Sequence, residues 1–168
     1  GASLEEAQTR IVEHARAVFA REIVVRDVDQ KTIAVAIRRG DRFLVLRRVA
    51  ARGGFRQIVT GRLEPGESPG EAALRELGEE TGLSPDLGVR VRPLGYEHAF
   101  AFALRDANAR PRLGREIVFL ADVPAGVEAR LSDEHDEMQW LPLDAAIAAV
   151  KHGGHRRALG LAAAAAFK

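Results

Sequence analysis

The feature that most constrains the fold is a predicted helix near the middle of the chain, with strong signals at both ends. Ser68 is a predicted N-cap, Pro69 occupies the first helical position, and Glu71 completes a capping box. Gly82 follows the last helical residue as a C-terminal stop. The sequence therefore predicts a helix over Glu71–Thr81 whose boundaries are set by local chemistry.

Three carboxylates share one face of this predicted helix. Glu76, Glu79 and Glu80 are spaced i, i+3, i+4, which places their side chains on the same side. Carboxylates held so close together repel one another, and a divalent cation such as Mg²⁺ or Mn²⁺, which prefers oxygen ligands, offsets that repulsion. Taken alone, however, these residues fit a solvated acidic surface better than a metal site.

Residues around the helix extend the pattern. Arg75 lies one turn before Glu79 and can form an ion pair with a carboxylate such as Glu67. Gly61 lets the backbone approach a ligand closely, and its carbonyl could be a further metal ligand. The segment Gly61–Leu83 fits G-x5-E-x7-R-E-U-x-E-E-x-G-U, where U is aliphatic, at every fixed position. At average residue usage, a chance match at one start is on the order of 10⁻⁸ or rarer.

This pattern resembles the signature of the Nudix hydrolase family. The resemblance implies an α/β fold, a Nudix-type α/β/α sandwich with a mixed sheet, and attack by a metal-activated water on a phosphorus atom of a pyrophosphate. Mg²⁺ is the expected cofactor, with Mn²⁺ as a substitute, and Glu76 is expected to be either a ligand or the general base. The resemblance assigns catalysis to Glu76, Arg75 and Glu67, and metal binding to Glu76, Glu79, Glu80 and Gly61.

Two further segments resemble one branch of this family, the bacterial dihydroneopterin triphosphate pyrophosphohydrolases, also described as dATP pyrophosphohydrolases. The first is the run QIVTG at 57–61, and the second is Glu134-His135 followed by Trp140. The branch resemblance implies that Glu134 is an additional metal ligand. The alternative is that residues 132–137 form a solvated acidic loop.

Four residues outside the box are predicted to contact the substrate. Arg47 and Arg48 end a predicted strand and could hold phosphates bidentately, with Arg47 favoured by the alternation of sides; a solvated strand end is the alternative. Phe55 could stack on a base or pterin, and Gln57 belongs to the run shared with the branch. Where the branch usually has Trp directly before Gln57, this chain has Arg56, which leaves the substrate's identity open.

Basic and histidine residues gather near the C-terminus. Lys151, Arg156 and Arg157 are interpreted as ordinary charges at a helix end, with contact to a triphosphate as the alternative. His152 and His155 flank a pair of glycines and are interpreted as surface residues, because no further ligand type lies near them in the sequence.

The rest of the chain mixes strands and helices without the regular alternation of a doubly wound sheet. Residues 1–30 are predicted to be an N-terminal helical extension, with an amphipathic helix at Leu4–Arg21, and residues 31–168 the Nudix domain. Strands are expected at Ile23–Val25, Thr32–Ile37, Phe43–Leu46, Val89–Val91, Tyr96–Leu104, Ile117–Val123 and Met138–Leu141, a polar loop at Arg105–Gly114, and helices at Leu143–Val150 and Arg156–Phe167.

Composition narrows the classes of function. The chain has 25 Lys and Arg against 24 Asp and Glu, a net charge of +1, which gives no reason to expect nucleic-acid or membrane binding. The absence of cysteine excludes thiol nucleophiles and an isopentenyl diphosphate isomerase, which needs a catalytic Cys. No stretch approaches the roughly 20 apolar residues that span a bilayer, so a cytoplasmic location is expected. The oligomeric state stays open, a homodimer included.

The predicted function is Mg²⁺-dependent cleavage of a small-molecule nucleoside triphosphate or dihydroneopterin triphosphate to the monophosphate and pyrophosphate. One alternative is a Nudix hydrolase of another nucleoside diphosphate derivative, such as an oxidised nucleotide, ADP-ribose or a dinucleotide. Another is a non-catalytic, ligand-sensing Nudix domain. Sensing domains tend to lose box carboxylates, whereas this chain keeps all of them.

Overall fold

The computed structural model describes residues 30–102 and 112–167. The predicted helix Leu4–Arg21 and strand Ile23–Val25 lie outside the described residues, so the N-terminal extension stays a prediction. None of the helices in the described part of the chain is long and apolar enough to span a membrane. The strands are β1 (Gln30–Arg39), β2 (Arg42–Arg48), β3 (Arg56–Gln57), β4 (Val59–Arg62), β5 (Arg90–Phe102), β6 (Arg112–Asp122) and β7 (His135–Pro142); the helices are α2 (Pro69–Thr81), α3 (Leu143–Ala149) and α4 (Gly153–Ala164), with 3-10 turns η2 (Ala50–Arg52) and η3 (Pro85–Leu87).

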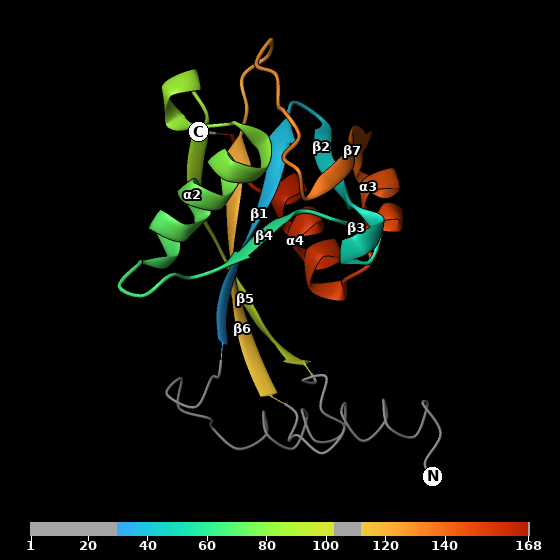
Figure 1. Ribbon diagram of the computed structural model, residues 1–168. Helices are drawn as coiled ribbons and strands as arrows, with labels where there is room; N and C mark the ends of the chain where they lie inside the picture. The colour runs from blue at the N-terminus through green and yellow to red at the C-terminus, as the bar shows by residue number, and fades with distance from the viewer. Residues whose placement is uncertain (1–29, 103–111, 168) are drawn as a thin grey trace. The chain divides into compact units, whose positions relative to one another are not determined.

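Strand β1 is central to a seven-stranded sheet. The strand order is β3-β2-β1-β6-β5, with β4 also pairing with β1 and β7 with β2. Strands β2 and β4 are antiparallel to β1, whereas β6 runs in the same direction as β1 (Figure 1). The ends of these two parallel strands meet where the Val123 N–H donates to the Arg38 carbonyl at 2.8 Å. The sheet is therefore mixed, as predicted.

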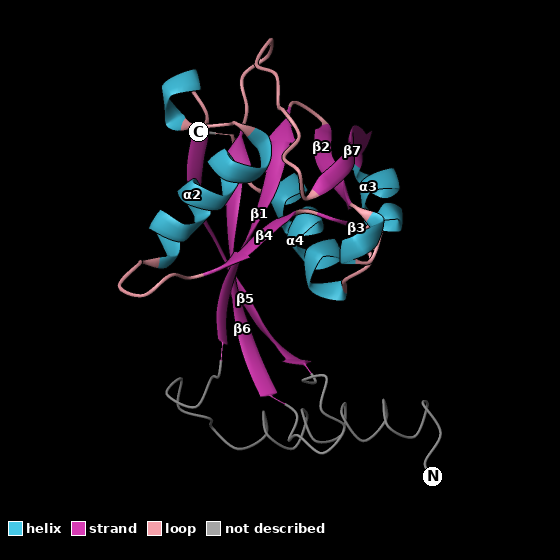
Figure 2. Cartoon of the chain, in the orientation of Figure 1, coloured by secondary structure: helices cyan, strands magenta, loops and turns pink. Residues whose placement is uncertain are grey.

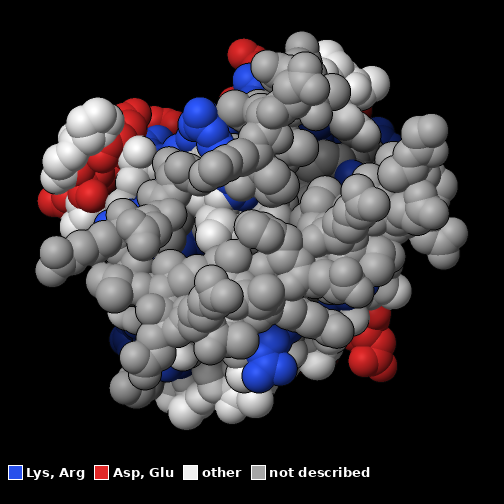
Figure 3. Space-filling model, turned by 90° about the horizontal axis from the view of Figure 1, so that it is seen from below, with Lys and Arg blue, Asp and Glu red and all other residues white. Residues whose placement is uncertain are grey.

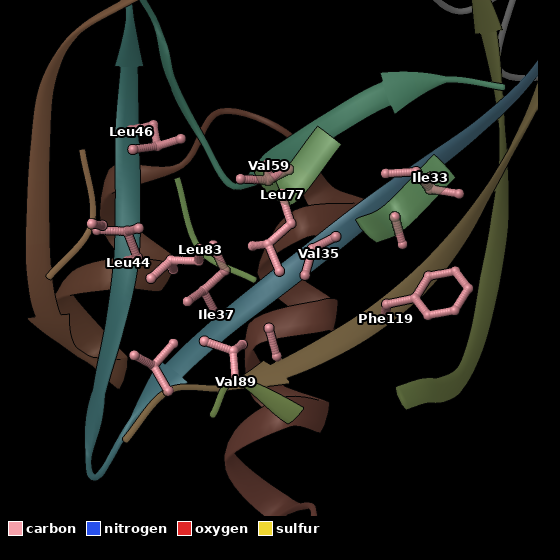
Figure 4. Close-up of a cluster of buried hydrophobic side chains, with 14 of the residues drawn as sticks. Ile33, Val35, Ile37, Leu44, Leu46, Val59, Leu77, Leu83, Val89 and Phe119 are labelled. Atoms are coloured by element: carbon pink, nitrogen blue, oxygen red, sulfur yellow. The ribbon is translucent and has the colours of Figure 1, made fainter. Parts of the chain in front are cut away.

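Alternate residues of β1 fill two separate cores. Ile33, Val35 and Ile37 pack on one side with α2 residues such as Leu77 (Figure 4), while Ala34 and Ala36 face the other side. Helices α3 and α4 contribute to that second core, and Figure 2 shows α2 and the α3–α4 pair on opposite faces of the sheet. A strand buried on both faces has a continuous apolar run rather than an alternating one. The predicted α/β/α sandwich is confirmed.

The ends of α2 follow from the predicted capping chemistry. The Ser68 hydroxyl accepts a hydrogen bond from the Glu71 N–H at 3.2 Å, and the Ser68 N–H donates to the Glu71 carboxylate at 2.8 Å. Gly82 ends the helix with φ of 69°, a left-handed conformation that favours glycine. The capping box and the position of Pro69 as the first helical residue are confirmed, so the helix begins two residues before the range predicted from Glu71.

Other predicted boundaries were wrong where pairing or packing overrides local propensity. The two expected strands at Val89–Val91 and Tyr96–Leu104 are one strand, β5, within the described residues. Strand β6 begins at Arg112, inside the expected polar loop. Helix α4 includes the two glycines that were expected to precede it, and it ends at Ala164 rather than Phe167. Burial of Ala158, Leu159 and Ala162 against the sheet outweighs the weak helix propensity of glycine.

A buried arginine joins the end of β1 to the end of α4. Arg38 is 1% exposed and donates to the Asp122 carboxylate at 2.6 and 3.0 Å. It also donates to the carbonyls of Ala162 and Ala165, at 2.7 and 2.8 Å. A cation is favourable at a helix C-terminus, where carbonyls lack helical partners. The sequence analysis assigned no role to Arg38.

The outer parts of β5 and β6 belong to a second compact unit, which includes His98–Glu116. Within it, His98 Nε2 lies 2.8 Å from the buried Glu116 carboxylate. The ring of Phe100 lies against the backbone of Gly114, where an added Cβ would come within 2.2 Å of a ring atom. Glycine at that position thus allows the aromatic ring to lie across the neighbouring strand. The predicted domain boundary at residue 30 stays a prediction.

Candidate active site

Strand β4 brings a glycine against a carboxylate of α2. The pairing of β4 with β1 fixes Gly61 opposite Ile33. A Cβ added at Gly61 would lie 2.1 Å from both Cδ and Oε1 of Glu76, so only glycine allows this approach. Gly61 and Glu76, which the sequence pattern placed in one box, are therefore brought together by the packing of β4 on α2.

Glu80 is a buried carboxylate with an incomplete set of partners. It is 4% exposed and accepts a backbone hydrogen bond from Thr60, while its Oε2 atom is buried with no hydrogen-bond partner. Burial, followed by the negative charges of Glu76 and Glu134, raises the pKa of Glu80 to about 9; the positive charge of Arg48 acts in the opposite direction. The helix thus holds a carboxylate where its charged form is costly without a cation.

Arg75 links the carboxylates of the loop and the helix. It donates to both oxygens of Glu67, at 2.8 and 3.0 Å, and to the Arg62 carbonyl at 2.9 Å. It also donates to Glu76 at 2.8 Å and to Glu79 at 3.3 Å. The hydrogen bond from Arg75 is the main reason that the pKa of Glu67 is lowered. The ion pair expected from the sequence is present.

The carboxylates of the box do not form a ready coordination shell. Within the described ranges, no three His, Asp or Glu side chains converge to hold a metal ion; Glu76 and Glu79 are instead hydrogen-bonded to Arg75. Acidic side chains nevertheless gather on the side of the molecule occupied by α2 (Figure 3). The unpartnered Oε2 of Glu80 and the close approach of Gly61 to Glu76 fit a hard cation bound by oxygen ligands.

Glu134 reaches this acidic group from the loop that precedes β7. Its charge contributes to the raised pKa values of both Glu76 and Glu80, so the fold brings these carboxylates within electrostatic range. Its Oε1 atom lies 3.1 Å from Nη2 of Arg52, and its backbone carbonyl accepts from the Val49 N–H at 3.0 Å. Sequence reasoning missed Arg52, because no spacing rule relates positions so far apart in the chain.

The two arginines that end β2 have different surroundings. Arg47 forms ion pairs with Asp136 at 2.7 Å and Glu137 at 2.9 Å. Arg48 has a buried Nε atom without a hydrogen-bond partner, and its charge lowers the pKa of Glu80. Alternation does separate the two side chains, but the geometry favours Arg48, rather than Arg47, as the arginine near the acidic group. Phosphate contact by either residue stays a prediction.

The comparison with known families decides the classification. A model of the NUDIX domain matches residues 28–160, more than three quarters of the chain. The chain belongs to the Nudix family. The class predicted from the sequence, hydrolases acting on phosphoric anhydride bonds, is the class of this family.

Three proteins are notably similar to this Nudix chain. The solved structure of the E. coli dihydroneopterin triphosphate pyrophosphohydrolase has a TM-score of 0.67 and 28% identity, over 79% of this chain and 94% of that one. The Myxococcus xanthus octanoyltransferase is 38% identical over 165 residues, 96% of this chain but 44% of that protein. The rat asymmetrical bis(5'-nucleosyl)-tetraphosphatase is 37% identical over 87 residues, 51% of this chain and 54% of that protein. The chain thus spans about half the length, or less, of these two curated relatives.

Gln57 and Phe55, the other two residues predicted to contact the substrate, each lie beside a histidine. Gln57 is buried, with its Nε2 atom 3.4 Å from Nε2 of His135, whose pKa is lowered mainly by burial. Phe55 is half-buried, and its ring contacts the His152 ring edge-on at 5.2 Å.

The interpretation of His155 as a surface residue was wrong: it is 3% exposed, because its face of α4 packs against the sheet.

Proposed function

We propose that this Nudix chain is a Mg²⁺-dependent pyrophosphohydrolase of a nucleoside triphosphate or dihydroneopterin triphosphate, releasing the monophosphate and pyrophosphate. The observation that carries this proposal is the buried Glu80 carboxylate, with one oxygen unpartnered and the charges of Glu76 and Glu134 nearby. Like charges accumulate in a protein interior only at a cost, which a divalent cation offsets. A structural role for the cluster would be served better by neutral side chains.

The roles of the residues follow from their surroundings. Mg²⁺, when bound, lowers the pKa of a water molecule and neutralises charge on the phosphate oxygens. Glu79, Glu80 and Glu134 would hold the cation, with Gly61 contributing its carbonyl. Glu76 is suited to accept a proton, because burial raises the pKa of its carboxyl group.

Two arginines, Arg75 and Arg48, have supporting roles in the proposed mechanism. Arg75 fixes one oxygen of Glu76 by a 2.8 Å hydrogen bond and is itself held by both oxygens of Glu67. Arg48 supplies positive charge close to Glu80, where the negative charge of a phosphate chain would need compensation. No side chain has to act as a covalent nucleophile in this scheme.

The similar proteins support two substrate classes. The E. coli structure, at 28% identity, favours dihydroneopterin triphosphate. The rat relative favours a dinucleoside tetraphosphate as the second candidate. The match covers only 44% of the octanoyltransferase, so this similarity gives no ground for proposing acyl transfer by this chain.

Metal removal with product identification tests the proposal. We expect activity on a triphosphate to vanish in EDTA and to return with Mg²⁺ or Mn²⁺, because the proposed mechanism needs a divalent cation to activate the attacking water. A panel of nucleoside triphosphates, dihydroneopterin triphosphate and diadenosine tetraphosphate should be assayed for pyrophosphate, orthophosphate and mononucleotide. Full activity after thorough metal removal would reject the mechanism, and orthophosphate as the sole direct product would reject the assigned products.

Glu134 can be tested against its neighbour Asp133. If Glu134 is a metal ligand, Glu134→Ala should lose at least about tenfold more activity than Asp133→Ala, in line with the cost of weakening a metal site. Asp133 is exposed and makes no ion pair within the described residues, which suits it as a control. Glu137 is unsuitable, because it pairs with Arg47 and Arg56. Steady-state turnover at saturating Mg²⁺ gives the comparison, and equal losses would remove Glu134 from the ligand set.

A further inference from the structure

Two cations from distant parts of the chain lie against the ring of Phe55. The Lys151 Nζ atom is 4.6 Å from the ring centroid, and the Arg48 Cζ atom is 5.6 Å from it. Backbone hydrogen bonds fix this arrangement, since the Arg48 N–H donates to the Phe55 carbonyl and the Lys151 N–H donates to the Arg56 carbonyl, both at 3.0 Å. The two charges are thus placed by β2, β3 and the segment before α4.

Among the residues that the structure describes, this pair differs from the neighbouring arginines in its salt-bridge partners. Neither Lys151 nor Arg48 makes an ion pair there, whereas Arg47, Arg52 and Arg56 each pair with a carboxylate of the loop or strand around β7. The Nε atom of Arg48 is also buried without an acceptor. Two cations on one ring repel each other, and an anion that binds both would relieve the repulsion and supply acceptors.

This cation pair adjoins the carboxylate cluster. Arg48 lies over the Phe55 ring and is the register partner of His135 on β7, the residue next to Glu134. Lys151 lies over the same ring, with its Nζ atom 4.6 Å from the centroid. If the two phosphates that share the cleaved bond bind at the carboxylates, the next phosphate of the chain can bind to Lys151 and Arg48.

We propose that Lys151 and Arg48, supported by Phe55, bind a phosphate group of the substrate beyond the two that share the cleaved bond. The site then selects compounds with three or more linked phosphates over those with two. Phe55 acts as a support for the cations rather than as a stacking surface for a base. The inference rests on the proposed function for the identity of the reacting phosphates, but the anion site itself can be tested without catalysis.

Calorimetric binding of inorganic tripolyphosphate and of pyrophosphate, each with Mg²⁺, measures the site directly. Lys151→Ala should weaken tripolyphosphate binding about tenfold, the size expected for one charge-assisted contact, and change pyrophosphate binding far less. Lys151→Arg should restore most of the affinity. Arg157→Ala is the matched control, because it removes the same charge from the same region while Arg157 lies over Tyr96 at 5.6 Å.

Kinetics give the second readout. With a triphosphate, Lys151→Ala should raise KM about tenfold with kcat retained, the signature of lost uniform binding, while Arg157→Ala should leave KM unchanged. Equal effects of Lys151→Ala and Arg157→Ala in calorimetry would overturn the inference. The inference would also be overturned if Phe55→Leu changed the preference for one base over another while Lys151→Ala had no effect. Absence of hydrolysis by the wild-type chain would instead reject the proposed function, leaving the tripolyphosphate result to decide on the anion site.

Discussion

Replacing Glu80 by Gln is expected to lower turnover by about 10²- to 10³-fold while making the metal-free protein more stable. Glu80 is buried, its Oε2 lacks a partner, and its pKa is about 9 in the folded state against an ordinary value of 4.5. Glu80 therefore destabilises the folded protein at every pH at which the unfolded chain would carry this carboxyl group ionised. An uncharged amide of similar shape removes that cost and also removes a metal ligand.

The effect should depend on pH in a defined direction. Below pH 4.5 the carboxyl is protonated in both states, so Gln and Glu should give similar stability. As pH rises from 4.5 to 9, the folded state retains a proton that the unfolded state has lost, and the penalty for Glu80 grows. At about 1.4 kcal/mol per pKa unit, the gain at pH 8 is on the order of a few kcal/mol. Thermal unfolding in EDTA at pH 4.5 and pH 8 measures it.

Glu79→Gln is the control for this substitution. Glu79 lies one residue earlier on the same helix, but its side chain is 60% exposed, so its charge costs little in the folded protein. Glu79→Gln should therefore reduce turnover and metal-dependent stabilisation without raising the metal-free melting temperature. If both variants retain near-normal turnover, the metal site lies elsewhere; if Glu80→Gln lowers the metal-free melting temperature at pH 8, the assigned charge state of Glu80 is wrong.

Replacing Arg75 by Ala is expected to have the next largest effect, lowering both the melting temperature and turnover. Its guanidinium holds Glu67 at 2.8 and 3.0 Å and Glu76 at 2.8 Å, so its removal leaves these carboxylates without their shared cation. Loss of a residue that orients ligands in this way costs about 10- to 100-fold in metal affinity or activity. Thermal unfolding and metal titration, each compared with wild type, test the two parts.

Two further variants separate charge from geometry at this position. Arg75→Lys keeps the charge but loses the planar fork that bonds both oxygens of Glu67, and it should fall between wild type and Arg75→Ala. Arg62→Ala removes an exposed arginine from the neighbouring strand β4 and should change neither measurement. An Arg75→Ala protein with unchanged metal affinity would show that Arg75 serves stability alone.

The sequence by itself determined the parts of the site that lie close together along the chain. The helical period of 3.6 residues relates Arg75, Glu76, Glu79 and Glu80, and the capping residues set where α2 begins and ends. The apolar run Thr32–Ile37 also predicted a strand, which is part of β1. These features depend on local geometry, which a residue pattern describes well.

Only the tertiary structure decided which distant residues meet. The pairing of β7 with β2 brings Glu134 to the acidic group, and a hydrogen bond beside β3 brings Lys151 to Phe55. The side of the strand on which Arg48 lies, opposite to the one favoured from alternation, depends in the same way on how β2 is packed. Strand register and helix packing result from the burial of whole faces, so no spacing within one segment specifies such contacts.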